Sequence, residues 1–452
     1  MYSNKLKYIL LIFLIIYSVD YSAAQQVSSV EHPDWSYNLS IYEVNTRQYT
    51  PEGTFEAFDL HIKELKDLGV GIVWFMPINP IGEKNRKGSL GSYYSVKDYK
   101  AVNPEFGTLE DFKETVKLIH DEGMYVIIDW VANHTAWDNI WVKDHPDFYT
   151  KDSSGDFVSP VPDWHDVIDL NYDNRELRKY MIDAMKYWVE KCDIDGFRCD
   201  VAGMVPMDFW KEAHTELNKI KPVFMLAEAE GPQFCEAFDM TYSWDLLHLM
   251  NDISQGKAGV RSLKDYFTKE SDKYPVDTYK MRFTTNHDEN TWNGTVFERM
   301  GDAAETFDAF TCVITGMPLV YSGQEAGLNK RLKFFDKDTI QWKESKYRFL
   351  YTRLLLEKKK NQALWNGDKG GKMVPVKSSA DEIFAFVRQK GKYKVYAVFN
   401  FSDKKIRTEL DSRLIAGEYT DLISDRKMQI KSKEWLEFQP WNYRILVTTP
   451  DE

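Results

Sequence analysis

The sequence predicts an α/β protein: a (β/α)8 TIM barrel with a short inserted domain after the third strand and a C-terminal antiparallel β domain. Two observations predict this fold class. From about residue 38, short apolar runs alternate with amphipathic helical patterns, as in a parallel sheet covered by helices. From residue 366 the helical period is lost, and segments such as 382–388 and 393–399 follow the pattern of antiparallel strands instead.

Eight segments of the barrel region have the length and composition of strands. Residues 70–76 (Val-Gly-Ile-Val-Trp-Phe-Met) form a near-continuous apolar run, as expected of a strand that is buried on both faces. A doubly wound sheet fits less well, because no glycine-rich phosphate-binding turn follows the first strand. The expected strands, of which the sixth is the weakest, are 40–46, 70–76, 124–129, 193–199, 222–227, 237–240, 281–286 and 318–322.

The segment 108–122 illustrates the helices between them. Four apolar residues recur on one helical face, and Thr108 stands where an N-cap is expected. Asp111 suits the first turn, and Gly123 stands where a helix commonly ends in a left-handed residue. The pattern therefore predicts a helix with both ends defined.

The chain divides into a targeting segment and three structural parts. Residues 1–24 have the features of a signal peptide, because two lysines precede a short apolar run and small residues then offer a cleavage site. Residues 25–365 contain the barrel, and the aromatic stretch 131–174, rich in Asp and Pro, is its inserted domain. Residues 366–452 form a C-terminal β-sandwich domain. We expect a secreted or periplasmic protein with no membrane span in the mature chain, an uncleaved anchor being the weaker interpretation.

Composition excludes several classes of function. The 452 residues are 43% hydrophobic and 28% charged, which is typical of a globular protein. With 58 basic and 70 acidic residues the formal charge is −12, which argues against nucleic acid as a partner. Four cysteines are too few for a disulfide scaffold in a chain of this length. We expect a monomer.

Charged residues gather where four of the expected strands end. Chemistry in such a barrel is performed at the C-terminal ends of the strands. Any one of these charges could be a helix cap or a surface residue, but four such strand ends in one barrel are hard to reach by accident. The four segments are 129–134, 196–200, 224–228 and 283–288.

Two of these segments carry a pair of carboxyl groups suited to glycoside hydrolysis. Arg198 and Asp200 are two residues apart on a strand, so both side chains are expected to point into the barrel mouth. The guanidinium is expected to lower the pKa of Asp200 and keep it anionic, and that anion would help to keep Glu228 protonated. A carboxylate nucleophile and a carboxylic acid about 5 to 5.5 Å apart are the arrangement for retaining glycoside hydrolysis.

Two histidines and a third carboxyl group complete the candidate site. His134 and His287 can form hydrogen bonds with sugar hydroxyls, and Asp288 can contact ring hydroxyls or a developing positive charge. The two histidines could also bind zinc together with Asp200 and Asp288. This is the weaker interpretation, because Arg198 would oppose a dication and the sequence lacks the usual zinc-ligand spacings.

With these residues assembled, the chain from about residue 38 to its end resembles glycoside hydrolase family 13, the α-amylase family. The four main conserved segments of that family are present in order. The resemblance implies that Asp200 is the nucleophile, Glu228 the general acid/base and Asp288 the stabiliser of the transition state. Residues 166–171 and 316–325 resemble two further segments of the family.

The resemblance also implies which residues bind the substrate. The supporting positions of the family are matched by Arg198, His134 and His287, and Tyr94 matches its aromatic platform under the sugar at the cleavage point. The implied partner is an α-glucan.

A single structural calcium ion is a further implication of the resemblance. Asn133 and Asp169 match side-chain ligands between barrel and insertion, with a backbone carbonyl near Met204. Members of the family often carry His where Met204 stands, which weakens the expectation without removing it, because a carbonyl ligand does not need that side chain. The chemistry itself requires no cofactor.

We therefore expect a secreted retaining hydrolase of α-1,4-glucosidic bonds in starch-type glucans or maltooligosaccharides, acting through a covalent glycosyl-aspartate. One alternative is a related α-glucan enzyme: a transglycosylase, or a hydrolase of α-1,6 links or disaccharides. Another is a glucan-binding protein that has lost catalysis, against which the intact Asp200, Glu228 and Asp288 argue.

Overall fold

The computed structural model describes residues 29–448, so the expected signal peptide lies outside the described residues. Eight parallel strands close into a barrel in the order β1-β10-β9-β8-β7-β6-β3-β2, which confirms the predicted fold class. Each predicted strand segment overlaps one barrel strand. The barrel strands are β1 (Ile41–Val44), β2 (Ile72–Phe75), β3 (Tyr125–Trp130), β6 (Gly196–Cys199), β7 (Phe224–Ala227), β8 (Met240–Thr241), β9 (Tyr279–Arg282) and β10 (Met317–Tyr321).

The predicted bounds of the seventh strand, 281–286, are wrong by several residues. The strand β9 begins at Tyr279 and ends at Arg282, and the next four residues are not part of a strand. The charges of Lys280 and Arg282 look unlike a buried strand in the sequence, yet both side chains are buried. Arg282 is paired with Glu270 of the outer helical layer at 2.5 Å, which makes its burial tolerable.

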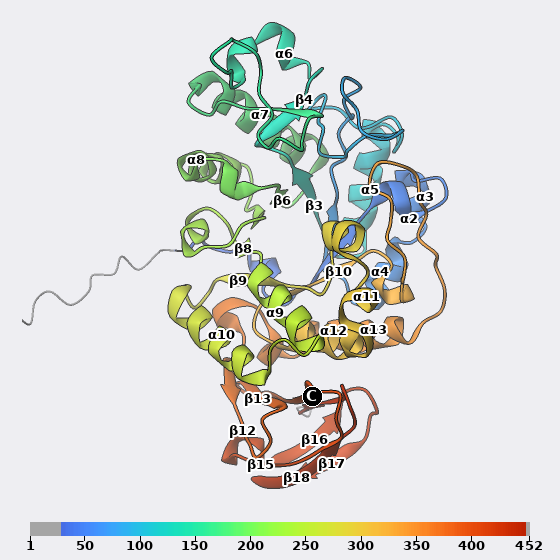
Figure 1. Cartoon of the computed structure of the whole chain (residues 1–452), viewed down its shortest axis with the longest axis vertical. Coiled ribbons are helices and arrows are strands. Elements are labelled where there is room, and N and C mark those ends of the chain that lie inside the picture. Colours follow the sequence, from blue (N-terminus) through green and yellow to red (C-terminus); the bar gives the residue numbers. More distant parts are fainter. Residues whose placement is uncertain (1–28, 449–452) are drawn as a thin grey trace, which may run out of the picture.

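Helices surround the barrel and bury its outer face (Figure 1). The longer ones present an apolar face to the strands and a charged face to solvent. The helices of this layer are α2 (Thr46–Tyr49), α3 (Phe55–Asp59), α4 (Ile62–Leu68), α5 (Leu109–Asp121), α7 (Arg175–Cys192), α8 (Met207–Asn218), α9 (Trp244–Ser254), α10 (Val260–Lys273), α11 (Val296–Met300), α12 (Ala304–Val313) and α13 (Lys346–Lys360).

The ends of α5 form as its sequence predicts. The Thr108 side chain accepts a hydrogen bond from the backbone N–H of Asp111, and the Asp111 carboxylate accepts one from the backbone N–H of Thr108. This reciprocal pair satisfies two N–H groups that a helix leaves unpaired. Gly123 adopts a φ of +69°, the left-handed conformation that ends the helix at little steric cost.

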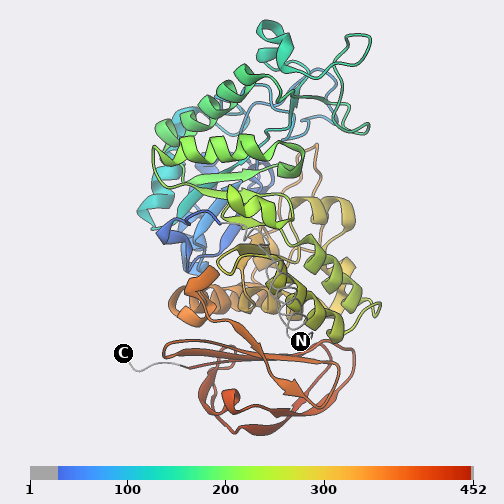
Figure 2. The same ribbon diagram turned by 90° about the vertical axis from the view of Figure 1, so that its left-hand side faces the viewer.

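The inserted segment and the C-terminal strands lie at opposite ends of the long axis of the molecule (Figures 1 and 2). In the insertion, β4 (His134–Ala136) pairs antiparallel with β5 (Val167–Asp169), and a short helix α6 (Trp141–Asp144) lies between them. His134 is directly opposite Asp169 in this pair. The insertion therefore connects a predicted sugar-binding residue with a predicted calcium ligand.

The C-terminal strands form two antiparallel sheets that enclose a second hydrophobic core. This arrangement confirms the predicted β domain. The six-stranded sheet of this domain also packs on the barrel, where the ring of Phe399 in that sheet contacts Phe310 of α12 with centroids 5.2 Å apart. The strands are β11 (Met373–Pro375), β12 (Lys377–Ser378), β13 (Ile383–Lys390), β14 (Tyr393–Asn400), β15 (Ile406–Asp411), β16 (Gly417–Asp421), β17 (Lys427–Ile430), β18 (Lys433–Phe438) and β19 (Tyr443–Val447).

Gly196 sets the close approach of the two strands that carry the predicted catalytic carboxyl groups. It begins β6 with a φ of +157°, and a Cβ atom there would lie 1.9 Å from the carbonyl oxygen of Phe224 on β7. Only glycine fits between these backbones. The strand pairing that follows places Arg198 opposite Leu226, just before Glu228.

A buried acid in the helical layer gives the first testable prediction. Asp308 accepts a 2.5 Å hydrogen bond from Thr284, and burial raises its pKa from 3.8 to about 7. The folded chain thus holds this proton more tightly than the unfolded chain. The resulting stability is complete below pH 4 and is lost as the pH rises through about 7. Over that range the free energy of unfolding should fall by up to about 4 kcal/mol through this group.

The Asp308→Asn variant should lack this component of the pH dependence, because an amide does not ionise. The measurement is urea unfolding of both proteins between pH 4.5 and pH 8. If the two free energies of unfolding stay parallel over the whole range, Asp308 does not hold the proton.

Candidate active site

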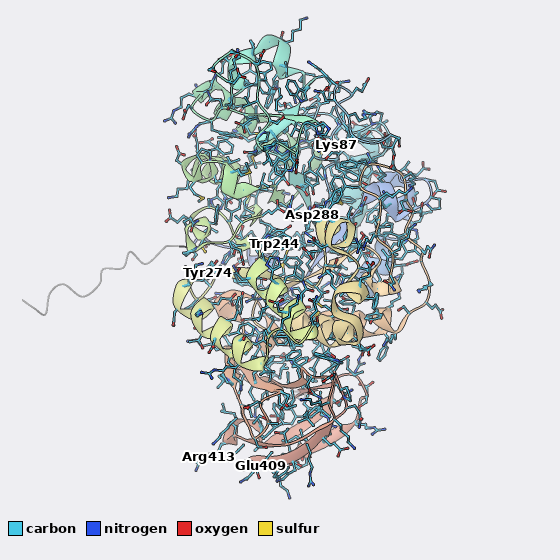
Figure 3. All side chains as sticks on the ribbon, in the orientation of Figure 1. Lys87, Trp244, Tyr274, Asp288, Glu409 and Arg413 are labelled. Atoms are coloured by element: carbon cyan, nitrogen blue, oxygen red, sulfur yellow. The ribbon has the colours of Figure 1, made fainter. Side chains whose placement is uncertain are left out.

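The structure brings the predicted catalytic carboxyl groups together at one end of the barrel. Asp200 follows β6, Glu228 follows β7 and Asp288 follows β9, so each side chain comes from the C-terminal end of a strand. The Asp200 residue is 7% exposed, and the Asp288 side chain is 35% exposed. Asp288 lies near the middle of the molecule, between the insertion and the helices that face the C-terminal domain (Figure 3).

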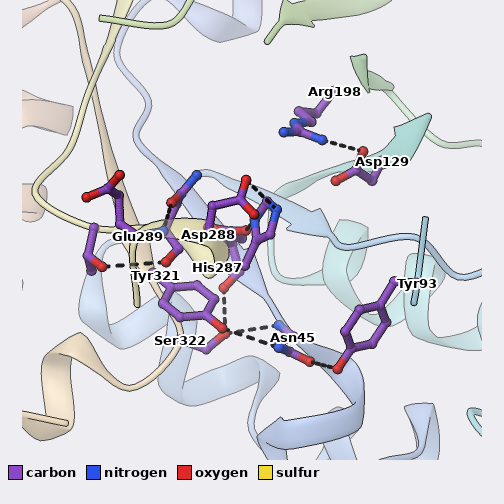
Figure 4. Close-up of polar contacts among 12 residues, drawn as sticks. Asn45, Tyr93, Asp129, Arg198, His287, Asp288, Glu289, Tyr321 and Ser322 are labelled. Carbon is purple, nitrogen blue, oxygen red and sulfur yellow. Dashed lines mark hydrogen bonds and ion pairs between the residues drawn. The ribbon is translucent and has the colours of Figure 1, made fainter. Parts of the chain in front are cut away.

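Arg198 is the cation at the centre of the site, and its side chain is fully buried. Its Nη1 lies 2.9 Å from Asp129 and 3.1 Å from Asp200, and its Nη2 lies 2.7 Å from Glu228. The contact with Glu228 is a close ion pair, because its angle is too poor for a hydrogen bond. Its Nε donates to the hydroxyl of Tyr242 at 3.2 Å. One guanidinium therefore holds three carboxyl groups in fixed positions (Figure 4 draws Arg198 with Asp129).

Arg198 was predicted to lower the pKa of Asp200, but other groups around Asp200 have a stronger, opposite effect. Arg198 does lower the pKa of Asp200, as its charge requires. Burial and the neighbouring Glu228 carboxyl act in the opposite direction and are stronger, so the pKa of Asp200 lies well above its usual range. The expectation of a lowered pKa was therefore wrong, because the sequence does not reveal the burial or the second carboxyl group.

Glu228 accepts a hydrogen bond that the sequence analysis missed. The backbone N–H of Val201 donates to Glu228 Oε2 at 2.7 Å. Val201 directly follows Asp200 and has a φ of +36°, which is an outlier for a β-branched residue. Strained backbone of this kind is held in place by surrounding contacts and is frequent at functional sites. The strain here directs an N–H group at the predicted acid/base.

His287 lies between two acids and the predicted sugar platform. Its Nδ1 is 2.5 Å from Glu43 Oε1, and its Nε2 is 2.8 Å from the Tyr94 hydroxyl and 3.2 Å from Asp288. Despite burial, the charges of Asp288 and Glu43 raise the pKa of His287 well above 6.5. The imidazolium in turn lowers the pKa of Asp288, which therefore remains an anion. Figure 4 shows His287 beside Asp288.

Glu43 is a site residue that the sequence analysis missed, although the sequence contains a signal for it. It is a single acid in the middle of a four-residue apolar strand, β1, and it is completely buried. A buried carboxyl group in such a strand needs a partner, which marks the position as unusual. The partner, His287, is 244 residues away in the chain.

The structure places Tyr94 beside His287 and places His134 at the start of β4 in the insertion. The Tyr94 hydroxyl donates to Asp129 at 3.0 Å, and its ring stacks on His287 with centroids 5.4 Å apart. Burial lowers the pKa of His134 to about 4, so this imidazole is neutral at neutral pH. Its ring lies 5.4 Å from that of Trp164 in the insertion. A neutral imidazole can both donate and accept hydrogen bonds, as recognition of a sugar hydroxyl requires.

Three aromatic residues on the connections at this end of the barrel differ in their exposure. Tyr242 and Trp141 are buried, and Tyr242 supports Arg198 instead of facing a ligand. Trp292 is 52% exposed and lies near enough to Asp288 to help lower the pKa of that carboxyl group. Of these three, only Trp292 presents a ring to the solvent beside the catalytic carboxyl groups.

Asn133 and Asp169 are adjacent and compatible with a calcium ion. The backbone N–H of Leu170 donates to the carbonyl of Asn133, which joins the two segments. Asp169 is half-buried, burial raises its pKa, and no cationic side chain of residues 29–448 pairs with it. The described chain has no cluster of three His, Cys, Asp or Glu residues suited to a metal. The coordination shell of a calcium ion bound to Asn133 and Asp169 can instead be completed by backbone carbonyl and water oxygens.

The fold and the site together define a class of protein: a barrel glycoside hydrolase with several carboxyl groups around one arginine. Comparison with family models identifies which one. The α-amylase catalytic domain matches residues 44–166 and 163–400, and the α-amylase C-terminal all-β domain matches residues 374–450. The chain belongs to the α-amylase family, glycoside hydrolase family 13.

Known proteins agree with this placement. The crystal structure of a maltogenic α-amylase, AmyB of Thermotoga neapolitana, is 33% identical with a TM-score of 0.84, covering 92% of this chain and 99% of that one. An α-amylase structure from Lactobacillus plantarum is 31% identical with a TM-score of 0.82, covering 91% and 99%. The curated α-amylase MalA of Haloarcula japonica is 24% identical over 87% of this chain, which spans only 60% of that relative's length.

Proposed function

We propose that this protein is a secreted retaining hydrolase of α-1,4-glucosidic bonds in starch-type glucans or maltooligosaccharides. The observation that carries the proposal is the set of carboxyl groups from Asp200, Glu228 and Asp288 around Arg198 and His287 at the barrel mouth. The name of the Thermotoga neapolitana relative, a maltogenic α-amylase, supports the choice of substrate.

In the first chemical step, Asp200 attacks the anomeric carbon of the bound sugar while Glu228 gives its proton to the departing glycosidic oxygen. The bond to the leaving chain breaks as the bond to Asp200 forms. Asp288 remains anionic beside His287 and stabilises the positive charge that develops on the sugar ring. Tyr94 and His134 orient the ring.

In the second step, Glu228 acts as a base and removes a proton from water, and the water oxygen attacks the same carbon from the opposite side. Asp200 leaves as a carboxylate beside Arg198. Two inversions restore the α configuration.

The charge balance of the site provides the proton for this chemistry. Five carboxyl groups surround two cations, so full ionisation would leave an excess of three negative charges in a buried space. Such a group of acids retains protons at neutral pH. We infer that Asp200 and Glu228 share one proton, and that a bound glycosidic oxygen draws it to Glu228. The acids are Glu43, Asp129, Asp200, Glu228 and Asp288, and the cations are Arg198 and His287.

Replacing Asp129 by asparagine should shift the pH profile of kcat/KM toward acid. The negative charge of Asp129 raises the pKa of Asp200, and Asp129 shares Nη1 of Arg198 with it. Removing that charge lowers the pKa of Asp200, and an Arg198 guanidinium that is no longer shared lowers it further, so the limb of the profile that depends on Asp200 should move to lower pH. An unchanged profile, or a shift toward alkaline pH, would show that Asp129 does not act on the pair electrostatically.

The substrate is tested with a panel of glucans: soluble starch, maltotriose, pullulan, isomaltose, sucrose and trehalose. The proposal expects starch and maltotriose to be cut at their α-1,4 links, with shorter maltooligosaccharides or glucose as products. If the protein cleaves only the α-1,6 links of pullulan, or only a disaccharide, the proposed substrate is wrong. The roles proposed for the catalytic residues would still stand.

We also propose one structural calcium ion, bound by Asn133 and Asp169. Removing it with EGTA should lower the melting temperature by several degrees, because a ligand bound only to the folded state stabilises that state. An Asp169→Asn variant should show a smaller response to EGTA. If neither the melting temperature nor the activity of the wild-type protein changes after exhaustive EGTA treatment, the site is absent.

Secretion and a monomeric state complete the proposal. No helix within residues 29–448 is long and apolar enough to cross a membrane. Fractionation of expressing cells should place the protein, shortened by residues 1–24, outside the cytoplasm, and light scattering should give the mass of one chain.

A further inference from the structure

The position of Glu228 in the barrel defines the two sides of the bound chain. The general acid protonates the departing oxygen, so the leaving part of the substrate lies on the Glu228 side. Glu228 follows β7, and β1 is four strands away from β7 in either direction around the closed barrel. The part of the chain that carries the non-reducing end therefore lies toward the ends of β1 and its neighbours, β10 and β2.

A long segment after β10, residues 328–345, lies over that half of the barrel. Figure 1 shows it in orange as a loop beside α2 and α3. Gln48 donates to two of its backbone carbonyls at 2.8 and 2.7 Å, which fixes it to the residues after β1. Asn290 and Thr291, from the residues after β9, each donate to another of its carbonyls at 3.0 Å. The segment is thus bound on two sides.

The residues after β2 join this segment to the insertion. Lys87 forms an ion pair with Asp166 at 2.9 Å and lies 5.9 Å from the ring centre of Phe335. Ser89 donates to the Asp336 carboxylate from both its backbone and its hydroxyl, at 3.0 and 2.6 Å. In Figure 3, Lys87 lies between Asp288 and the insertion. The connection is continuous from the end of β9 to the insertion after β3.

Aromatic rings line this connection next to the reaction centre. Phe334 lies parallel to Tyr94 at 6.1 Å, and Trp292 contacts Phe334 at 5.3 Å and Phe335 at 5.8 Å between ring centroids. Tyr94 is the platform proposed for the sugar at the cleavage point. These rings come from the residues after β9 and β10 and lie next to Tyr94, on the half of the barrel assigned above to the non-reducing end. We define the glycone-side wall as Lys87, Asp166, Trp292, Phe334 and Phe335.

We propose that the glycone-side wall makes this enzyme exo-acting: it attacks chains from their non-reducing end and releases a short product of one length. The proposal rests on the proposed function and adds the mode of attack. A chain that continues past the wall meets side chains joined by an ion pair, hydrogen bonds and ring contacts. The rim on the Glu228 side, at the ends of β6, β7 and β8, carries no member of the wall. The proposal places the leaving part of the chain on that side.

The test compares two aryl maltoheptaosides, one with a free non-reducing end and one with an acetal across O4 and O6 of that end. Wild-type protein should cleave the free substrate at least about 100-fold faster, because the blocked end clashes with the wall. Equal rates on the two substrates would contradict the proposal that the wall makes the enzyme exo-acting. The proposed hydrolysis of α-glucans would not be affected. Cleavage of neither would contradict the proposed function instead. In that case the proposal about the wall is tested by binding alone. The affinities of the free and the blocked oligosaccharide for the Asp200→Asn variant are compared, and equal affinities would overturn the proposal.

The second part of the test removes two side chains from the wall. The double variant K87A/F335A should narrow the difference between the two substrates about tenfold and give products of mixed length from starch. Its matched control is K405A/W435A in the C-terminal domain, where Lys405 pairs with Glu437 at 2.7 Å and Trp435 is 53% exposed. The control should retain the wild-type difference. A folded K87A/F335A that keeps the wild-type product length would contradict the proposal, and the wild-type comparison stands without this variant.

Discussion

Replacing Asp200 by asparagine is expected to lower kcat by on the order of 10⁴-fold or more, because an amide cannot form the glycosyl ester. The amide has nearly the same shape as the carboxylate and can accept the hydrogen bond of Arg198 Nη1 through its oxygen. Affinity for a maltooligosaccharide, measured by calorimetry, should therefore stay within a few-fold of wild type.

This variant separates an enzyme from a glucan-binding protein. Asp403→Asn, an exposed change in the C-terminal domain, is the matched control and should leave both turnover and affinity unchanged. Turnover that persists in Asp200→Asn would remove Asp200 from its role. If turnover is undetectable in the wild-type protein while the oligosaccharide still binds, the non-catalytic alternative is correct.

Replacing Glu228 by alanine is expected to lower kcat on maltooligosaccharides about 10²- to 10⁴-fold, because the leaving oxygen receives no proton. An aryl glycoside with an acidic phenol needs no such proton, so the first step should proceed and the glycosyl-Asp200 ester should accumulate. Azide can then enter the space left by the side chain, attack the ester and restore turnover. Because Asp200 holds the opposite face of the sugar, the product should be the α-glycosyl azide.

The configuration of the azide product distinguishes the roles of the two carboxyl groups. A β-glycosyl azide from Glu228→Ala would mean that azide attacks the substrate directly, as expected if the residue replaced is the nucleophile. Glu437→Ala, an exposed substitution in β18, is the control and should show wild-type rates with no response to azide.

The fold was largely predictable because its signals are local. Apolar runs of the right length mark the strands, and the cap residues of α5 define its ends in both sequence and structure. The seventh strand was predicted as 281–286, because the charge of Lys280 resembles that of a solvent-facing residue and concealed the true start at Tyr279, although Lys280 and Arg282 are both buried. Their burial depends on acids such as Glu270 that come from another element, and no local pattern shows that contact.

The site was predictable to the extent that it follows strand ends. Arg198 and Asp200 are neighbours in the sequence, so their pairing could be foreseen. The pKa of Asp200 could not, because burial and Glu228 determine it. Val201 gave no signal at all, since its left-handed backbone is imposed by the surrounding contacts. Glu43 left a signal as a lone acid in an apolar strand, but its partner comes from the other end of the barrel domain.

The glycone-side wall could not be predicted from the sequence either, because it depends on contacts between distant segments. Lys87, Trp292 and Phe335 come from three separate connections of the barrel and meet only in the folded chain. Chain length preference and mode of attack are properties of such loops, whereas the catalytic set is a property of strand ends.

Double displacement through Asp200 and single displacement by water differ in the configuration of the product that is released first. The protein without residues 1–24 is mixed with maltoheptaose, and the anomeric protons are followed by NMR during the first minutes, before mutarotation. Double displacement should release α-anomeric products first, and the β-anomer should appear later through mutarotation. Initial release of the β-anomer would mean a single displacement, and the role assigned to Asp200 would have to be abandoned.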